Sequence, residues 1–251
     1  MPIVHRLLYT WDGWPSGSGA SFPDAPDFSG IDPLWLGDGF RRLGCRWSRD
    51  LVQMSFDVEP AVSPVFFAMR VKGRLDHAMR QSGTPVNWSR KVGVRSLGDN
   101  TDAVVERYLL LQQKRGDFAD PRYARTLAEF SREFPSVRLN DPAESGRGRY
   151  WYNLHLVAVT GRRWRMGRED FLPRIASAIP EWADEEEIGL KSMSFMPDHV
   201  HLAFRGNPLR SPAEIAEGCW KALNRASGLR LFSDRVYVGS FSTYSRRSIG
   251  I

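Results

Sequence analysis

The sequence has few of the features that mark secreted or membrane proteins. Its 251 residues include only two cysteines, Cys45 and Cys219, and neither belongs to a CxxC or CxH motif. This argues against a disulfide framework or a cysteine zinc site and agrees with a reducing compartment. There is no run of about 18 apolar residues, which argues against a membrane span, and residues 1–6 do not resemble a signal peptide. We therefore expect a cytoplasmic protein without membrane contact.

The chain is long enough for one large domain or two small ones, each with its own hydrophobic core. Hydrophobic residues make up 42% and charged residues 25%, as in ordinary globular proteins. Basic residues outnumber acidic ones by 35 to 29, which gives a net charge of +6, and most are arginines. Because arginine binds phosphate in a bidentate manner, this excess favours a polyanionic partner such as nucleic acid, although charge alone does not identify one.

The two halves of the chain repeat the same order of predicted elements. Residues 50–56 align with residues 198–204 at an offset of 148, and so do Ser63-Pro64 and Ser211-Pro212, which predict helix starts. Beyond these helices the alignment continues at an offset of 144. A repeat at this spacing indicates a duplicated unit.

Each half is expected to contain a long strand, a pair of strands, a helix and a final strand. The expected ranges are residues 3–11, 40–56, 62–79 and 88–97 in the first half, and residues 150–160, 190–204, 211–226 and 232–241 in the second. Further helices are predicted at residues 103–113, 118–134 and 171–179. We divide the chain into an N-terminal unit (residues 1–116), a helix and linker (117–149) and a C-terminal unit (150–251).

The sharpest local signal is a pair of histidines. Residues two apart on a strand face the same side, so His199 and His201 project together, close enough to share one metal ion. Val200, Leu202 and Phe204 make the other face of this strand apolar, which suits a central position in a sheet. The alternative is a pair of histidines that are only hydrogen-bonded on a sheet face.

Residues 195–202 read FMPDHVHL and closely resemble the signature of the single-tyrosine HUH transposases, a family that includes the REP-associated tyrosine transposases. Residues 236–241, VYVGSF, resemble the strand before the catalytic helix of this family. The resemblance covers residues 150–251 well, and residues 1–113 only through the internal repeat. It implies an α+β fold with a ferredoxin-like unit, which has helices on one face of an antiparallel sheet. With the repeat, we expect two such HUH-type units fused as a pseudo-dimer.

The resemblance also implies a chemistry that needs no nucleotide cofactor. In the family, two histidines and a glutamine bind Mg²⁺ or Mn²⁺, and a tyrosine attacks a DNA phosphate to give a 5′-phosphotyrosine and a free 3′-OH. The cation acts as a Lewis acid, and the covalent intermediate divides the transfer into two displacements. The expected partner is therefore single-stranded or hairpin DNA, in a bacterial cytoplasm and associated with the nucleoid.

The position of the tyrosine departs from the family pattern. The family's nucleophile lies in the last helix, but at the offset of 144 the position of Tyr108 falls beyond the last residue. The N-terminal unit has Leu51 and Gln53 at the histidine positions, yet it carries Tyr108 and Gln112 at the spacing of one helix face. We predict Tyr108 as the nucleophile and Gln112 as the third metal ligand beside the two histidines. The alternative is an ordinary amphipathic helix with a half-exposed tyrosine.

Other residues and functions remain open from the sequence. Five arginines near the strand predicted at residues 150–160 either contact the DNA backbone or form a solvated basic loop: Arg147, Arg149, Arg162, Arg163 and Arg165. His155 is a candidate core histidine, and Tyr244 is a second candidate nucleophile. The rival functions are a domesticated hairpin-binding protein that no longer cleaves DNA, and a metal-dependent phosphodiesterase that uses water instead of tyrosine.

Overall fold

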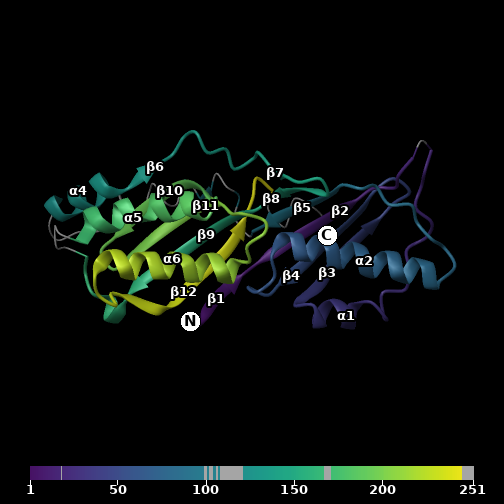
Figure 1. Ribbon diagram of the computed structural model, residues 1–251, viewed down its shortest axis with the longest axis horizontal. Coiled ribbons are helices and arrows are strands. Elements are labelled where there is room, and N and C mark those ends of the chain that lie inside the picture. The colour runs from purple at the N-terminus through teal and green to yellow at the C-terminus, as the bar shows by residue number, and fades with distance from the viewer. Residues whose placement is uncertain are drawn as a thin grey trace.

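The computed structural model describes residues 1–17, 19–98, 101, 104–105, 107, 121–166 and 171–244, and it has the predicted α+β class (Figure 1). The described residues form two six-stranded sheets along the long axis of the molecule, with helices packed on one side of them. Within these ranges, no helix combines the length and apolarity needed to cross a membrane.

Each half of the chain supplies most of one sheet. The N-terminal sheet has the order β3-β4-β2-β5-β8-β7, from β2 (Leu8–Gly13), β3 (Phe40–Trp47), β4 (Val52–Val58), β5 (Val92–Leu97), β7 (Ala143–Glu144) and β8 (Gly148–Trp151). The C-terminal sheet has the order β1-β12-β9-β11-β10-β6, from β1 (Ile3–Arg6), β6 (Arg132–Glu133), β9 (Asn153–Thr160), β10 (Gly189–Met196), β11 (His199–Arg205) and β12 (Phe232–Phe241). The helices are α1 (Asp32–Gly37), α2 (Pro64–Gln81), α4 (Pro121–Phe130), α5 (Phe171–Glu185) and α6 (Pro212–Ser227), with a 3₁₀ turn, η1 (Gly161–Arg163).

The two sheets repeat one pattern of strand pairing in the same register. The order β5-β2-β4-β3 corresponds to β12-β9-β11-β10. In the first sheet Ser55 of β4 lies opposite Thr10, and in the second Ala203 of β11 lies opposite His155. Ser55 and Ala203 keep the offset of 148 that the sequence alignment predicted.

Both sheets also contain the same irregularity. The pairing of β3 with β4 shifts between Arg42 and Gly44, and the pairing of β10 with β11 shifts between Leu190 and Ser192. These positions again differ by 148. A bulge inserts one extra residue into a strand and increases its twist, so a bulge at equivalent places gives the two sheets the same curvature.

Each sheet receives a short strand from the other half of the chain. The strand predicted at residues 3–11 divides at Leu7, because β1 pairs in parallel with β12 while β2 lies inside the N-terminal sheet. The strand predicted at residues 150–160 divides at Tyr152, where β8 pairs in parallel with β5 and β9 lies inside the C-terminal sheet. The prediction of single long strands was therefore wrong, because alternating side chains indicate an extended segment without indicating its pairing partner.

The helices of the two halves meet where they begin. Ser63 caps α2 and Ser211 caps α6, so both Ser-Pro helix starts are confirmed. The amide of Val65 donates to the carbonyl of Pro208 at 3.2 Å, and the amide of Ala213 donates to a carbonyl in the loop before α2 at 2.8 Å. This reciprocal contact holds α2 and α6 on the same side of the two sheets, as Figure 1 shows.

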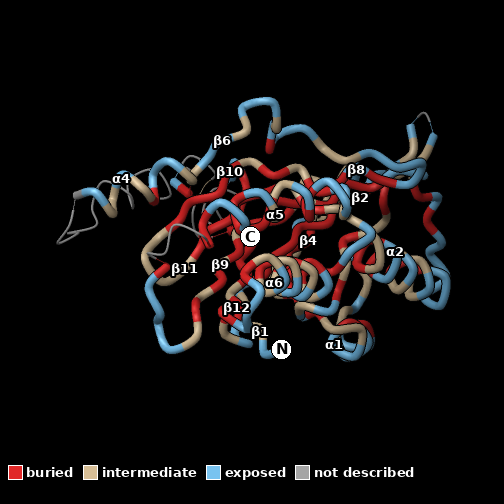
Figure 2. Tube along the Cα trace, turned by 60° about the vertical axis from the view of Figure 1, so that its left-hand side comes forward, coloured by how far each residue is buried: buried red, intermediate tan, exposed pale blue. Residues whose placement is uncertain are grey.

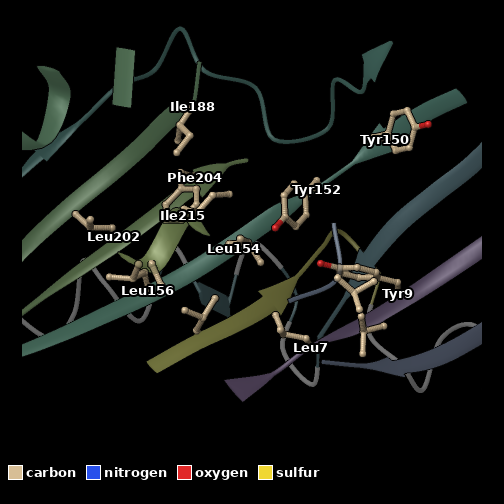
Figure 3. Close-up of a cluster of buried hydrophobic side chains, with 14 of the residues drawn as sticks. Leu7, Tyr9, Tyr150, Tyr152, Leu154, Leu156, Ile188, Leu202, Phe204 and Ile215 are labelled. Carbon is tan, nitrogen blue, oxygen red and sulfur yellow. The ribbon is translucent and has the colours of Figure 1, made fainter. Parts of the chain in front are cut away.

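One hydrophobic core runs through both halves. Buried residues follow the strands and the inner sides of the helices (Figure 2). At the crossing, Leu7 and Tyr9 lie near Tyr152 and Leu154 (Figure 3), and the rings of Tyr9 and Tyr152 meet edge to face with centroids 6.0 Å apart. The halves are therefore not packed as independent globules.

Two buried serines join the strands at the crossing. The Oγ atom of Ser240 accepts a hydrogen bond from the amide of Leu8 at 2.8 Å. At the equivalent place, the Oγ atom of Ser96 accepts from the amide of Asn153 at 2.9 Å and donates to the carbonyl of Phe241 at 2.8 Å. Each serine thus satisfies main-chain groups where a strand passes from one sheet to the other.

We expect Ser240→Ala to lower the free energy of unfolding by about 1–3 kcal/mol, because it leaves the buried amide of Leu8 without its acceptor. Urea unfolding followed by tryptophan fluorescence measures this change. Ser177→Ala, on the exposed side of α5, is the matched control and should change the free energy by less than about 0.5 kcal/mol. Equal stability of the two variants would contradict the role assigned to Ser240.

Candidate functional site

The histidine pair lies on β11, on the sheet face opposite the helices. The ring centroids of His199 and His201 are 4.7 Å apart and their planes meet at 71°, so both project to one side, as their spacing predicted. Strands β9 and β10 flank β11 on both sides. The main-chain ladder therefore holds the two histidines rigidly with respect to each other.

A carboxylate orients the first histidine. The Nδ1 atom of His199 lies 2.6 Å from Oδ1 of Asp198, and Arg163 donates to the other carboxylate oxygen at 3.0 Å. Burial by itself would raise the pKa of Asp198, but the hydrogen bonds from His199 and Arg163 outweigh it, and the pKa is lowered. An ionised Asp198 favours a proton on Nδ1, so Nε2 of His199 keeps the lone pair that can bind a metal.

A third histidine contacts the second. The Nε2 atom of His155 on β9 lies 3.0 Å from Nδ1 of His201, and the two rings are parallel within 6° at a centroid separation of 5.2 Å. The sequence suggested His155 only as a core residue. Its contact engages Nδ1 of His201, so a metal bound by this ring would be bound through Nε2.

Burial keeps these imidazoles neutral. It lowers the pKa of His155 to about 4. The pKa of His201 is lowered to about 2, first by burial and then by the nearby His155 and His199. Neutral imidazole is the form that binds metal ions, so at neutral pH His201 needs no deprotonation before it can bind a cation.

The described donor set fits part of a metal site. Within the described ranges, no three His, Cys, Asp or Glu side chains are arranged to hold a metal ion. Two Nε2 atoms on one rigid strand suit a divalent cation whose remaining ligands come from outside this set. The predicted nucleophile Tyr108 and third ligand Gln112 both lie outside the described residues, so their roles stay predictions.

A segment of the N-terminal half reaches the histidine face. Val105 packs in one small cluster with Ala203 and Phe241. Ala203 follows His201 by two residues on β11 and therefore shares its face. Val105, which follows β5 of the other sheet, thus packs on the sheet that carries the histidines, together with Leu139.

The equivalent face of the N-terminal sheet has different chemistry. Leu51 and Gln53 stand at the positions of His199 and His201, as the alignment predicted. The Nε2 atom of Gln53 donates to Oδ1 of Asp12 at 2.9 Å. No imidazole occupies these two positions, and a polar amide–carboxylate pair lies there.

Tyr244, the second candidate nucleophile, follows β12 but lies over the N-terminal sheet. The guanidinium of Arg95, on β5, is 5.3 Å from the centroid of its ring. Tyr244 is therefore associated with the sheet whose histidine positions hold leucine and glutamine, and it is the weaker candidate for a nucleophile.

The five arginines predicted to contact DNA stand before, within or after strands β8 and β9: Arg147, Arg149, Arg162, Arg163 and Arg165. Arg163 donates to Asp198, which connects the turn after β9 to the histidine site. Arg149 instead pairs with Glu144 at 3.0 Å on the N-terminal sheet. Arg163 is therefore the member of this set with a described link to the histidines.

Residues 149–236 match the family model described as transposase, IS200-like. The match includes the histidine strand and confirms the resemblance found in the sequence. This part of the protein is therefore similar to a DNA-processing domain of the transposase type. The match supports a DNA-related function at this coarse level and does not extend to the N-terminal half of the chain.

The comparisons add little beyond this match. No curated protein matches the chain. Among solved structures, the chain is similar to a bacterial light-regulated adenylyl cyclase at 8% identity, over 88% of this chain and 64% of that one, with a TM-score of 0.19. A likeness at this TM-score carries no argument about fold or function.

Acid should destabilise the metal-free protein between about pH 6.5 and pH 4. The pKa of His155 is 6.5 in the unfolded chain and about 4 in the folded protein. Across this window the unfolded chain binds more protons than the folded one, so the free energy of unfolding falls as the pH falls. His155 alone accounts for a loss of about 2 kcal/mol between pH 7 and pH 5. Urea unfolding in EDTA at several pH values measures it. His155→Gln should reduce the slope by the share of His155 and leave the share of His201, whose pKa is also lowered, and an unchanged slope would contradict the assignment.

Proposed function

We propose that this protein cleaves and rejoins single-stranded DNA through a 5′-phosphotyrosine, in an active site assembled from both halves of one chain. The observation that carries the proposal is that Val105 belongs to the same small hydrophobic cluster as Ala203, which lies on the histidine face. Val105, Tyr108 and Gln112 are spaced i, i+3 and i+7, which is the spacing of one helix face. In this proposal Tyr108 and Gln112 would therefore serve the histidines of the C-terminal unit.

The repeated pairing supports a fused pseudo-dimer. The strand order of each half, the position of its bulge and the exchange of one short strand all recur at offsets of 144–148. We interpret the halves as two ferredoxin-like units that arose by duplication. In such a chain only one working copy of each part is needed, so the second histidine pair and the second tyrosine are dispensable.

Each residue has a defined task in this mechanism. His199 and His201 would hold Mg²⁺ or Mn²⁺ through Nε2, while Asp198 and His155 orient their rings. The bound cation supplies Lewis-acid stabilisation of the charge on the scissile phosphate. The oxygen of Tyr108 forms a bond to phosphorus as the bond from phosphorus to the 3′ oxygen breaks. The phenol proton is released and the leaving oxygen becomes the free 3′-OH.

Metal binding tests the first part of this proposal. The double variant His199→Ala/His201→Ala should lose most of its affinity for Mn²⁺ in calorimetry, while its circular dichroism spectrum stays that of the folded protein. His77→Ala, which changes an exposed histidine on α2, is the matched control and should bind Mn²⁺ normally. Unchanged Mn²⁺ binding in the double variant would exclude the histidine pair as the metal site.

Covalent trapping tests the composite site. A hairpin oligonucleotide labelled at its 3′ end should become attached to the protein in Mn²⁺, because a 5′-phosphotyrosine retains the downstream fragment. Tyr108→Phe should abolish the labelled protein band on a denaturing gel and leave DNA binding nearly intact, whereas Tyr244→Phe should keep the band. Cleavage without a band would favour the water-using phosphodiesterase, and hairpin binding without cleavage would favour the domesticated DNA-binding protein.

A further inference from the structure

The open face of the N-terminal sheet carries aromatic rings and arginines where the other sheet carries histidines. Trp14, Arg46 and Tyr244 are exposed there, while Arg95 and Trp151 are partly buried. We call this surface the N-terminal platform and define it as Trp14, Arg46, Arg95, Trp151 and Tyr244. Strand pairing places Arg46 opposite Gln53 and Arg95 opposite Trp151. The platform therefore surrounds the Asp12–Gln53 pair on the face opposite α1 and α2.

At one side of the platform, an arginine lies between two rings. The guanidinium of Arg95 is 4.1 Å from the ring centroid of Trp151 and 5.3 Å from that of Tyr244. Both distances are within the range of cation–π attraction. Tyr244 is 51% exposed and comes from the end of the C-terminal half, so this surface, like the histidine site, contains residues from both halves.

At the other side, a tryptophan lies over a glycine. A Cβ atom on Gly93 would lie 3.4 Å from the ring of Trp14 and 3.2 Å from a carboxylate oxygen of Asp12. The missing side chain thus makes room for the ring against the sheet. The main chain is also fixed, because the carbonyl of Trp14 accepts a hydrogen bond from the amide of Ser89 at 2.8 Å. Trp14 is nevertheless 41% exposed.

This exposure is uncommon in the described part of the chain. Of its aromatic residues, only Trp14, Trp164 and Tyr244 are exposed by more than a third, and two of these three lie on the platform. Exposed rings beside arginines match the surfaces that bind unpaired bases, since every base has a face that can stack and every nucleotide a phosphate. The Asp12–Gln53 pair adds an acceptor and a donor that suit base edges.

We infer that the N-terminal platform binds single-stranded DNA, with bases stacked on Trp14, Trp151 and Tyr244 and phosphates beside Arg46 and Arg95. Duplex DNA does not fit this chemistry, because its bases are already stacked inside the helix. Because α2 and α6 cover one side of both sheets, the platform and the histidine site share the other side. One strand can therefore extend from a hairpin near the histidines onto the platform. The inference rests on the proposed function only in taking DNA as the partner.

The test compares two hairpins that differ only in an unpaired extension of about ten nucleotides, within the range of known single-strand site sizes. Fluorescence anisotropy in EDTA measures binding without cleavage. The double variant Trp14→Ala/Tyr244→Ala should raise the Kd for the extended hairpin at least about tenfold, the loss expected from one or two stacked bases. The Kd for the blunt hairpin should stay within about twofold, because that hairpin has the same stem and loop but lacks the unpaired extension that the platform is inferred to bind.

Matched variants separate stacking from general effects. Leu36→Ala removes a large side chain that is 63% exposed on α1, away from the platform, and should leave both Kd values unchanged. Arg46→Gln, at an exposed position, should weaken binding of the extended hairpin and reduce the salt slope of log K by about one. An equal loss for both hairpins, or no loss for the extended one, would overturn the inference. Tighter binding of an RNA extension of the same sequence would overturn its assignment to DNA.

The binding measurement in EDTA tests the platform separately from the proposed cleavage by Tyr108. Binding in EDTA requires neither the metal nor Tyr108, so loss of stacking in the platform variants would stand even if Tyr108→Phe still formed the covalent adduct. The opposite result is that the platform variants bind the extended hairpin as tightly as the unaltered protein while the adduct still depends on Tyr108. That result would support the catalytic proposal and contradict the inference about the platform.

Discussion

The exchange of strands β1 and β8 between the two sheets is the constraint on which the rest of the structure depends. Each exchanged strand pairs in parallel with the last long strand of the other half, and each crossing is fixed by a buried serine, Ser240 or Ser96. Neither half completes its own six-stranded sheet, and the core continues through the crossing. The two open faces are consequently held side by side in one rigid relation, as a two-site DNA-binding surface requires.

The two sheets have equivalent strand orders, but their open faces differ in polarity. One holds two imidazoles on a rigid strand, in which Nδ1 of His199 contacts Asp198 and Nδ1 of His201 contacts His155. The other replaces the pair by Leu51 and Gln53 and surrounds the site with exposed rings and arginines. A metal site needs fixed donors and few competing protons, whereas a surface that binds unpaired bases needs accessible rings and permanent positive charge. The duplication proposed above would allow both kinds of surface in one chain.

The crossing also explains how residues far apart in the sequence meet. Val105, which follows β5, shares a small hydrophobic cluster with Ala203 and Phe241 of the C-terminal sheet, and Tyr244, which follows β12, lies near Arg95 of the N-terminal sheet. The first observation supports the proposal that the N-terminal half contributes to the histidine site, and the second gives the platform one of its proposed stacking rings.

The sequence by itself determined the local features. It predicted the helix starts at Ser63 and Ser211, the common face of the histidine pair and the offsets that relate the two sheets, because caps and side-chain alternation depend on residues a few positions apart. Only the tertiary structure decided that His155 contacts His201 and that the predicted long strands divide at Leu7 and Tyr152. These outcomes depend on which distant strands pair, and an extended segment has the same alternation whichever sheet it joins.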